Sequence, residues 1–144
     1  MATHFKMGFE GQIKYGVAGS AATVLLENTG DITYTLSHER GDSTVRGDSS
    51  GPPIQTSSVT ARIAGVEFQM KNYPSDASLE AMRVACAAGT PVAIKCRDHA
   101  TGKGFDGDVN VEVSSPYPLG GEQVVSITCT PTRDGGRMPQ LYVV

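Results

Sequence analysis

Carboxylates are the side chains whose spacing comes closest to a chemical site in this chain of 144 residues. Four polar side chains alternate with valines along residues 105–115: Asp106, Asp108, Asn110 and Glu112. Alternate residues of a β-strand point to the same side, so these four are predicted to share one face. Two carboxylates on one face can act as general acid and base. No basic residue interrupts this face, and we therefore interpret it as an acidic, solvated surface.

Neither a metal site nor a cofactor site is predicted. Asp106 and Asp108 have the spacing of the first calcium ligands of an EF-hand, but the loop of about twelve residues that closes with a glutamate is missing. The three cysteines are widely spaced and form no CxxC pair: Cys86, Cys96 and Cys129. This spacing argues against a zinc site and a disulfide framework, and the apolar neighbours of each cysteine favour buried, reduced thiols.

The histidines give no sign of an active site either. All three fall in predicted arm or loop segments: His4, His38 and His99. None lies near a serine or cysteine in the setting of a nucleophile elbow. We expect no enzymatic activity.

Composition narrows the class of protein further. The length favours one domain over residues 1–144. A net charge of −3 argues against tight phosphate binding, which needs clustered lysines and arginines. Aromatic residues make up only 6% of the chain, which is low for a glycan or single-stranded nucleic-acid platform. No apolar run reaches membrane-spanning length, so no membrane insertion is expected.

One helix is predicted, at about residues 75–88. Ser75 or Asp76 can cap its first turn, and Gly89 suits the left-handed residue that follows a helix end. A narrow apolar stripe on this helix would pack on a sheet: Leu79, Met82, Ala85 and Cys86.

The rest of the packed chain has the patterns of strands. Residues 31–37 alternate with period two, and Asp31 lies on their hydroxyl-rich face. Residues 58–71 change phase, which predicts a β-bulge or a sharp bend near residues 64–65 that keeps the apolar side chains, Phe68 among them, facing inward. The apolar end at 141–144 is expected to complete a sheet edge, in this subunit or the next. The predicted fold is mainly β (α+β), an antiparallel β-sandwich or half-barrel with one flanking helix.

Two segments have side chains that are too small or too polar to belong to that core. Residues 1–22 are rich in Gly, Ala and Ser, and we predict an N-terminal arm. Residues 38–57 are predicted to be a long polar loop, a kind of segment that is usually functional. Two Arg-Gly-Asp triplets in this loop, beginning at Arg40 and Arg46, are interpreted as turn chemistry and not as adhesion motifs.

The order of these elements resembles the tail tube (major tail) proteins of long-tailed bacteriophages, whose fold is shared by the tubes of contractile injection systems. Residues 22–28 lead into 31–34 and then into the polar loop. The bent strand and the lone helix follow, and the helix closes in Ala87-Ala-Gly-Thr-Pro91. A Pro/Gly turn then leads into the last long strand at 124–128.

The resemblance implies hexameric rings that stack into a hollow tube and conduct DNA at ejection. It places the protein in the virion tail, after assembly in the host cytoplasm. It also implies contacts with a terminator, a tape measure protein, a baseplate or tip, and the sheath of a contractile tail. With these expectations we assign the lumen lining to the acidic strand face: Asp106, Asp108, Asn110, Glu112 and Asp31. Contacts between rings are assigned to the polar loop: Arg40, Asp42, Arg46 and Asp48.

Three alternatives remain open at this point. The chain could be a tail-end or connector subunit on the same fold, or the tube of a contractile injection system. It could also be a β-sandwich binding module for a glycan or a protein. The size of the particles in solution separates the assembly proteins from the binding module, because a lone module stays small.

Overall fold

The computed structural model describes residues 7–46 and 51–143, and it is built almost entirely from antiparallel strands. The elements in chain order are η1 (Gly8–Glu10), β1 (Gln12–Val17), β2 (Val24–Leu25), β3 (Thr29–Asp42), β4 (Ser57–Lys71), α1 (Ala77–Ala88), β5 (Val92–Arg97), β6 (Gly104–Ser114), β7 (Val124–Pro131) and β8 (Gln140–Val143). The strands form one sheet in the order β2-β1-β5-β6-β7-β4-β3, and β8 pairs with β6. The predicted mainly-β fold with one flanking helix is confirmed.

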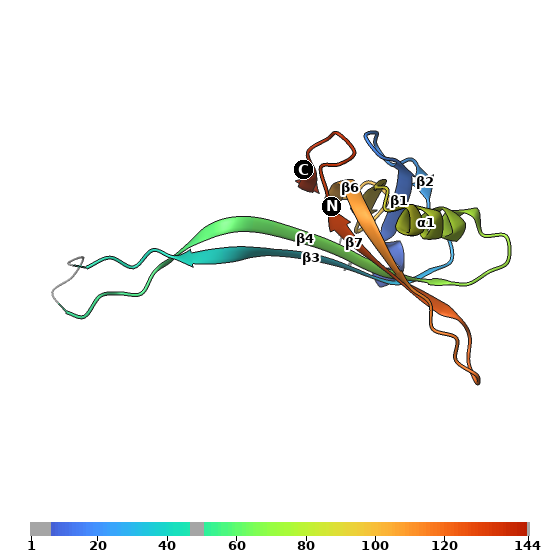
Figure 1. The fold of residues 1–144 in the computed structure, drawn as a ribbon, viewed down its shortest axis with the longest axis horizontal. Coiled ribbons are helices and arrows are strands. Elements are labelled where there is room, and N and C mark those ends of the chain that lie inside the picture. Colours follow the sequence, from blue (N-terminus) through green and yellow to red (C-terminus); the bar gives the residue numbers. More distant parts are fainter. Residues whose placement is uncertain (1–6, 47–50, 144) are drawn as a thin grey trace.

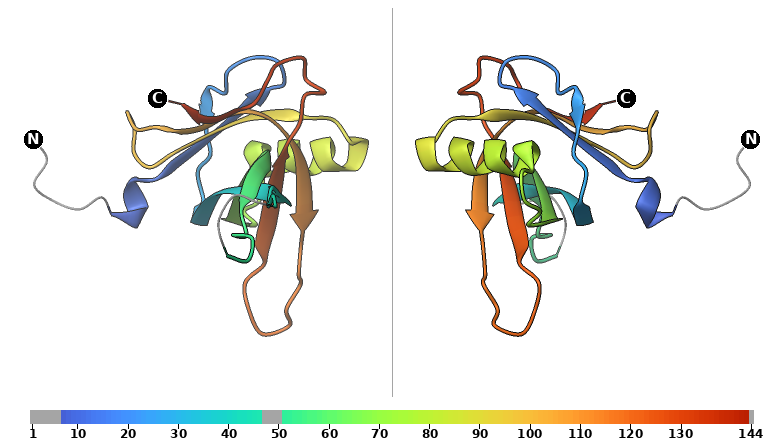
Figure 2. Two further views of the ribbon diagram at one scale, coloured as in Figure 1. Left: turned by 90° about the vertical axis from the view of Figure 1, so that its left-hand side faces the viewer. Right: turned by 90° about the vertical axis from the view of Figure 1, so that its right-hand side faces the viewer.

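Strand β6 belongs to two parts of this sheet. Its residues 104–109 pair with β5, and its residues 109–114 pair with β7. We call β2, β1, β5, β8 and the first half of β6 the β5 layer, and the second half of β6 with β7, β4 and β3 the β7 layer. The two layers cross, and α1 lies beside them (Figure 2). The architecture is an open sheet folded across β6, nearer to the predicted half-barrel than to two separate sheets.

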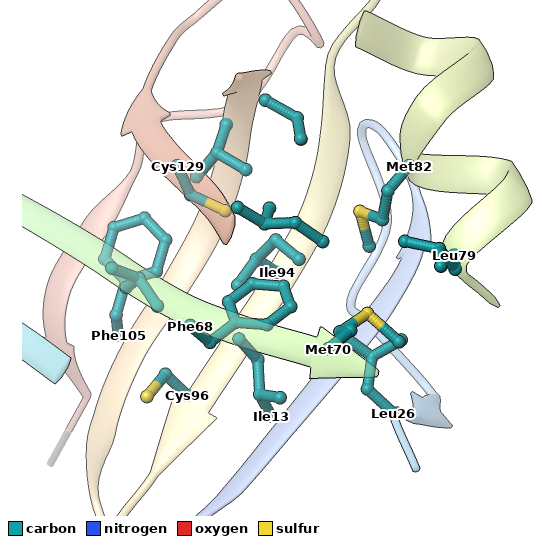
Figure 3. Packing of buried hydrophobic residues seen from close by; sticks show 14 of the residues in the cluster. Ile13, Leu26, Phe68, Met70, Leu79, Met82, Ile94, Cys96, Phe105 and Cys129 are labelled. Carbon is teal, nitrogen blue, oxygen red and sulfur yellow. The ribbon is translucent and has the colours of Figure 1, made fainter. Parts of the chain in front are cut away.

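The hydrophobic core lies inside this fold, between the two layers and α1 (Figure 3). Strand alternation selects its members, because every second residue of β4, β6 and β7 points inward. Phe68 and Met70 of β4 meet Ile94 of β5, while Leu79 and Met82 of α1 close one side. These side chains are essentially inaccessible to solvent.

Helix α1 follows the sequence prediction closely. The Asp76 carboxylate accepts hydrogen bonds from the N–H groups of Ser78 and Leu79, at 3.1 and 3.4 Å. Gly89 ends the helix in the left-handed conformation, with φ of 71°. Leu79, Met82 and Ala85 are buried as predicted. With 12 residues α1 is also too short to cross a membrane, and none of the described residues forms a helix long and apolar enough to do so.

The prediction of an N-terminal arm over residues 1–22 is wrong for its second half. Residues 12–17 form β1, which lies between β2 and β5, and Ile13 is buried in the core. The small side chains suggested weak packing, but here they let the two sides of the turn between β1 and β2 approach each other closely. A Cβ on Gly16 would lie 3.1 Å from the Cα of Ala22, so the turn between β1 and β2 folds tightly. Residues 1–6 of the predicted arm lie outside the described part of the chain.

The predicted polar loop is present, but strands occupy both of its ends. β3 continues to Asp42 and β4 begins at Ser57, so the connection spans 43–56. The residues of β4 that precede Val66 pair only with β3 among the described residues, and the two strands leave the body together (Figure 1). We call residues 35–46 and 51–65 the hairpin arm.

The β-bulge predicted near residues 64–65 is wrong. Pairing is regular from Tyr34↔Val66 to Glu39↔Ala61, and the register shift comes later, between Glu39 and Arg40. The pattern changes phase because β4 leaves the core there. Ala64 is the last buried residue on this side, and both faces of β4 are largely open to solvent from Ser57 to Ile63. As a result Ile63 points away from the core side and is 41% exposed.

Candidate functional site

The four polar side chains of β6 do not share one environment. Asp108 is completely buried, with a relative exposure of 0%, and the Asp106 side chain is 14% exposed. Asn110 and Glu112 are exposed. The predicted acidic, solvated face is therefore wrong at its first two positions and holds at the other two.

Asp106 and Asp108 belong to an ion cluster that includes a base. Arg137 Nε donates to Asp108 Oδ1 at 2.9 Å, and Arg137 Nη1 donates to Asp106 Oδ1 at 3.2 Å. The backbone N–H of Gly19 also contacts both carboxylate oxygens of Asp108, at 3.1 and 3.0 Å. These contacts join β6 to the turn between β1 and β2 and to the segment before β8. Charge pairing and hydrogen bonds together compensate for the desolvation of the buried carboxylate.

Glycines allow the chain to close around Asp108. A Cβ on Gly135 would collide with the Asp108 carboxylate, and Gly19 has φ of 88°. The sequence carries a turn signal at residues 134–136, Asp-Gly-Gly, but gives no direct sign of the role of Arg137. The one signal was a basic residue directly after a Gly-Gly pair, and its partner lies 29 residues earlier in the chain.

The assignment of Asp106 and Asp108 to a lumen lining is therefore corrected. The C-terminal segment and the turn between β1 and β2 cover the face on which they lie. A carboxylate that is closed off from solvent and paired with Arg137 cannot repel a passing polyanion at contact.

A different surface carries the exposed polar side chains. The strands of the β7 layer turn one face to the core and the other outward. The outward face, which we call the polar face, comprises Thr33, Thr35, Glu67, Gln69, Lys71, Asn110, Glu112, Ser114, Ser126, Thr128 and Thr130. Sequence reasoning missed Glu67 as a site residue. Because Phe68 was predicted to point inward, the adjacent Glu67 was bound to point outward.

Cross-strand pairing orders the polar face into rows. Thr33 pairs with Glu67, Glu67 with Thr128, and Thr128 with Glu112, so one row crosses four strands with alternating hydroxyl and carboxylate groups. The two carboxylates are separated by one strand, roughly 10 Å apart at strand spacing. This row contains no cation to neutralise them.

The polar face has one lysine, at its end. Lys71 Nζ lies 3.1 Å from Glu122 Oε2, and this hydrogen bond and charge raise the pKa of Lys71. The face therefore presents hydroxyls and carboxylates with no cluster of bases, which disfavours phosphate binding. Within residues 7–46 and 51–143, no group of three or more His, Cys, Asp or Glu side chains is arranged to hold a metal ion.

Asp31 and the predicted contact residues lie apart from these rows. Asp31 is exposed at the start of β3, within the irregularity between Thr29 and Ile32. Arg40, Asp42 and Arg46 are exposed on the hairpin arm, as expected for a contact surface. Asp48, the fourth predicted contact residue, lies outside the described residues.

Local hydrogen bonds hold the described end of the hairpin arm in shape. Asp42 Oδ1 accepts from the N–H of Thr44 at 2.9 Å, and this bond lowers the pKa of Asp42. Across the arm, the N–H of Ser43 donates to the Thr56 carbonyl at 3.1 Å. The arm is therefore a paired hairpin as far as Ser43 and Thr56.

The sheet has free edges. Within residues 7–46 and 51–143, β3 ends the strand order on one side and pairs only with β4, and β6 has no partner on its β5 side after Val109. Unpaired edges of this kind are templates for strands of another chain.

Comparison with known proteins gives a match in fold and none in sequence. No protein-family model matches the chain, and no curated protein matches it. A chain from the tail of an empty GTA particle, obtained by helical refinement with C6 symmetry, is similar in structure with a TM-score of 0.75. The match covers 95% of this chain and 98% of that one, at 14% sequence identity. The predicted resemblance to the tail tube fold is thus confirmed at the level of the fold.

Proposed function

We propose that this chain is the structural subunit of a phage-type tail tube, in which rings of six copies stack into a hollow conduit for DNA. The observation that carries the proposal is the structural match to a tail of C6 symmetry, which extends over 95% of this chain and 98% of the other. The protein is accordingly a component of the virion tail and has no catalytic function.

The free edges support closure into a ring. In a cyclic assembly each copy offers one surface to the next copy and a different surface to the previous one. The edge of β3 and the free side of β6 lie on opposite sides of the β7 layer and suit such a head-to-tail contact. Pairing between copies would remove both edges from solvent.

The polar face is the proposed lining of the channel. Glu67 and Glu112 supply negative charge, while Asn110 and the threonines supply neutral polar groups. Asp31 extends the acidic character at the start of β3. Like charge keeps phosphates from binding, so that DNA passes without adhering.

Contacts between rings are proposed for the hairpin arm. Arg40, Asp42 and Arg46 are exposed charges of both signs on an element that reaches well beyond the body (Figure 1). Further contacts with a terminator, a tape measure protein, a baseplate or tip, and a sheath belong to the same proposal.

Negative-stain electron microscopy across a concentration series of the purified protein tests the proposal. Rings or hollow tubes with a central channel are the expected result. Uniform single-chain particles at every concentration, also after addition of polyethylene glycol to promote association, would contradict it.

A further inference from the structure

The loop between β6 and β7, residues 115–123, exposes large apolar side chains at its tip. Leu119 is fully exposed and Tyr117 is 71% exposed. Pro116 and Pro118 restrict the backbone on either side of Tyr117. This loop projects from the body at the end opposite to the hairpin arm (Figure 1). Tyrosine is enriched among the residues that dominate binding energy, and an aromatic or aliphatic anchor that fills a pocket is a common centre of a protein interface.

An apolar pocket of about 480 Å³ lies at the other end of β7. Its apolar lining includes Ile63, Pro131, Met138 and Leu141. Ile63 and Met138 are exposed, so the pocket is open to solvent in the single chain. It lies where the hairpin arm leaves the body and beside the segment that Arg137 fixes to Asp108.

The tip and the pocket cannot meet within one chain. The loop enters β7 at Val124, whereas the pocket begins where β7 ends, at Pro131. The seven residue steps from Val124 to Pro131 separate them by about 23 Å. A second copy displaced along β7 would bring its loop tip to this pocket, and repetition of that step builds a stack.

Charge supports the same pairing. Arg62 and Arg133 also line the pocket, and their guanidinium groups have no ion-pair partner among the described residues. Glu122, at the base of the loop, keeps most of its side chain exposed although it contacts Lys71. An approaching loop therefore carries an exposed carboxylate toward two unpaired cations.

We propose that Tyr117 and Leu119 of one copy insert into the pocket of the next copy and join successive rings. The occupant of the pocket is a second copy of this chain, and the inference rests on the proposed tube. It assigns a role in stacking to the loop between β6 and β7, while the sheet edges close each ring.

Substitution of the anchor tests the inference. Leu119→Asp is expected to leave rings intact but to shorten the stacks at least about tenfold in median length. Leu119→Met, which keeps an apolar tip, is expected to give tubes of wild-type length. Tubes of wild-type length from the Leu119→Asp protein would overturn the inference. Absence of rings from the wild-type protein would instead overturn the proposed function, so the two failures are distinguishable.

Disulfide trapping gives a second, independent readout. Leu119→Cys and Met138→Cys proteins, both with Cys86→Ala, are mixed, assembled and oxidised at about pH 8. Burial raises the pKa of Cys96 to about 11 and of Cys129 to about 12, so both thiols stay protonated at that pH. A cross-linked dimer is expected from this mixture and not from a Leu119→Cys and Val84→Cys mixture. Failure to cross-link within assembled tubes would overturn the inference.

Discussion

The two halves of β6 have the same sequence pattern and opposite surroundings. In both halves an apolar or small residue alternates with a polar one, and the core-facing side chains Phe105, Val109 and Val111 are buried. On the other face, Asp108 is closed off from solvent and paired with Arg137, whereas Glu112 is exposed. The alternation itself predicts which residues share a face, but not whether that face is covered.

What differs between the halves is a distant segment of chain. The first half pairs with β5 and β8, and the residues that lead into β8 lie over its outer face. The second half pairs with β7, and among the described residues nothing covers its outer face. One strand therefore supplies an internal ion cluster at one end and an exposed polar surface at the other.

The largest expected effect comes from removing the buried carboxylate. Asp108→Ala leaves Arg137 Nε and the Gly19 N–H without their acceptor, and we expect a loss of about 3 kcal/mol in the free energy of unfolding. Urea denaturation measures this loss. Glu112→Ala is the matched control from the other half and should unfold close to wild type.

Equal losses for these two variants would break the comparison, because they would mean that both carboxylates have the same surroundings. A further variant, Arg137→Met, tests the pairing of Arg137 with Asp108 directly. The Asp108→Asn, Arg137→Met double variant should lose less than the sum of the two single changes, because it leaves no unpaired charge at position 108, whereas Asp106 loses its partner equally in the Arg137→Met and the double variant.

A smaller effect is expected from filling the space beside Asp108. Gly135→Ala places a Cβ against the carboxylate, and we expect a loss of about 1–3 kcal/mol from the resulting displacement. The control is Gly120→Ala, because a Cβ at Gly120 meets no atom nearby. Thermal denaturation measures the stability of both variants. Equal midpoints of unfolding for Gly135→Ala and Gly120→Ala would contradict the prediction.

The smallest effect on stability is expected on the polar face. Glu112→Lys reverses an exposed charge, and we expect the Tm to stay within about 2 °C of wild type. If the polar face lines the channel, the same change should make assembled tubes retain DNA, because a lysine in each copy adds a ring of positive charge. DNA retention, measured by filter binding, is compared with that of Glu80→Lys, an equal charge reversal at an exposed position of α1 outside the polar face. Equal DNA retention by the two variants would exclude the polar face as the lining.

Local patterns in the sequence were sufficient to predict the elements whose ends and buried faces are marked by their own residues. Asp76 and Gly89 marked the ends of α1, and the spacing of Leu79 and Met82 identified its buried side. Strand alternation likewise predicted the inward position of Phe68 and of the valines of β6. These features depend on neighbours within a few residues, which is why they can be predicted from the sequence.

Predictions failed where the deciding contact is remote in sequence. β1 was expected to be an arm because its small residues indicate weak packing, yet Gly16 is what lets Ala22 approach it closely. The phase change at Ile63 suggested a bulge, although it reflects the departure of β4 from the core. In both cases the local pattern was present, but contacts with another part of the chain, or the lack of them, decided which structure it formed.

The sequence by itself determined the strand-rich composition, the single helix, the inward-facing set and the order of elements on which the resemblance to tail tubes rests. Only the tertiary structure decided that Asp108 is internal and Glu112 external. The physical reason is that exposure depends on what covers a face. Arg137 reaches Asp108 from 29 residues further along the chain, and no periodicity in the sequence encodes that contact.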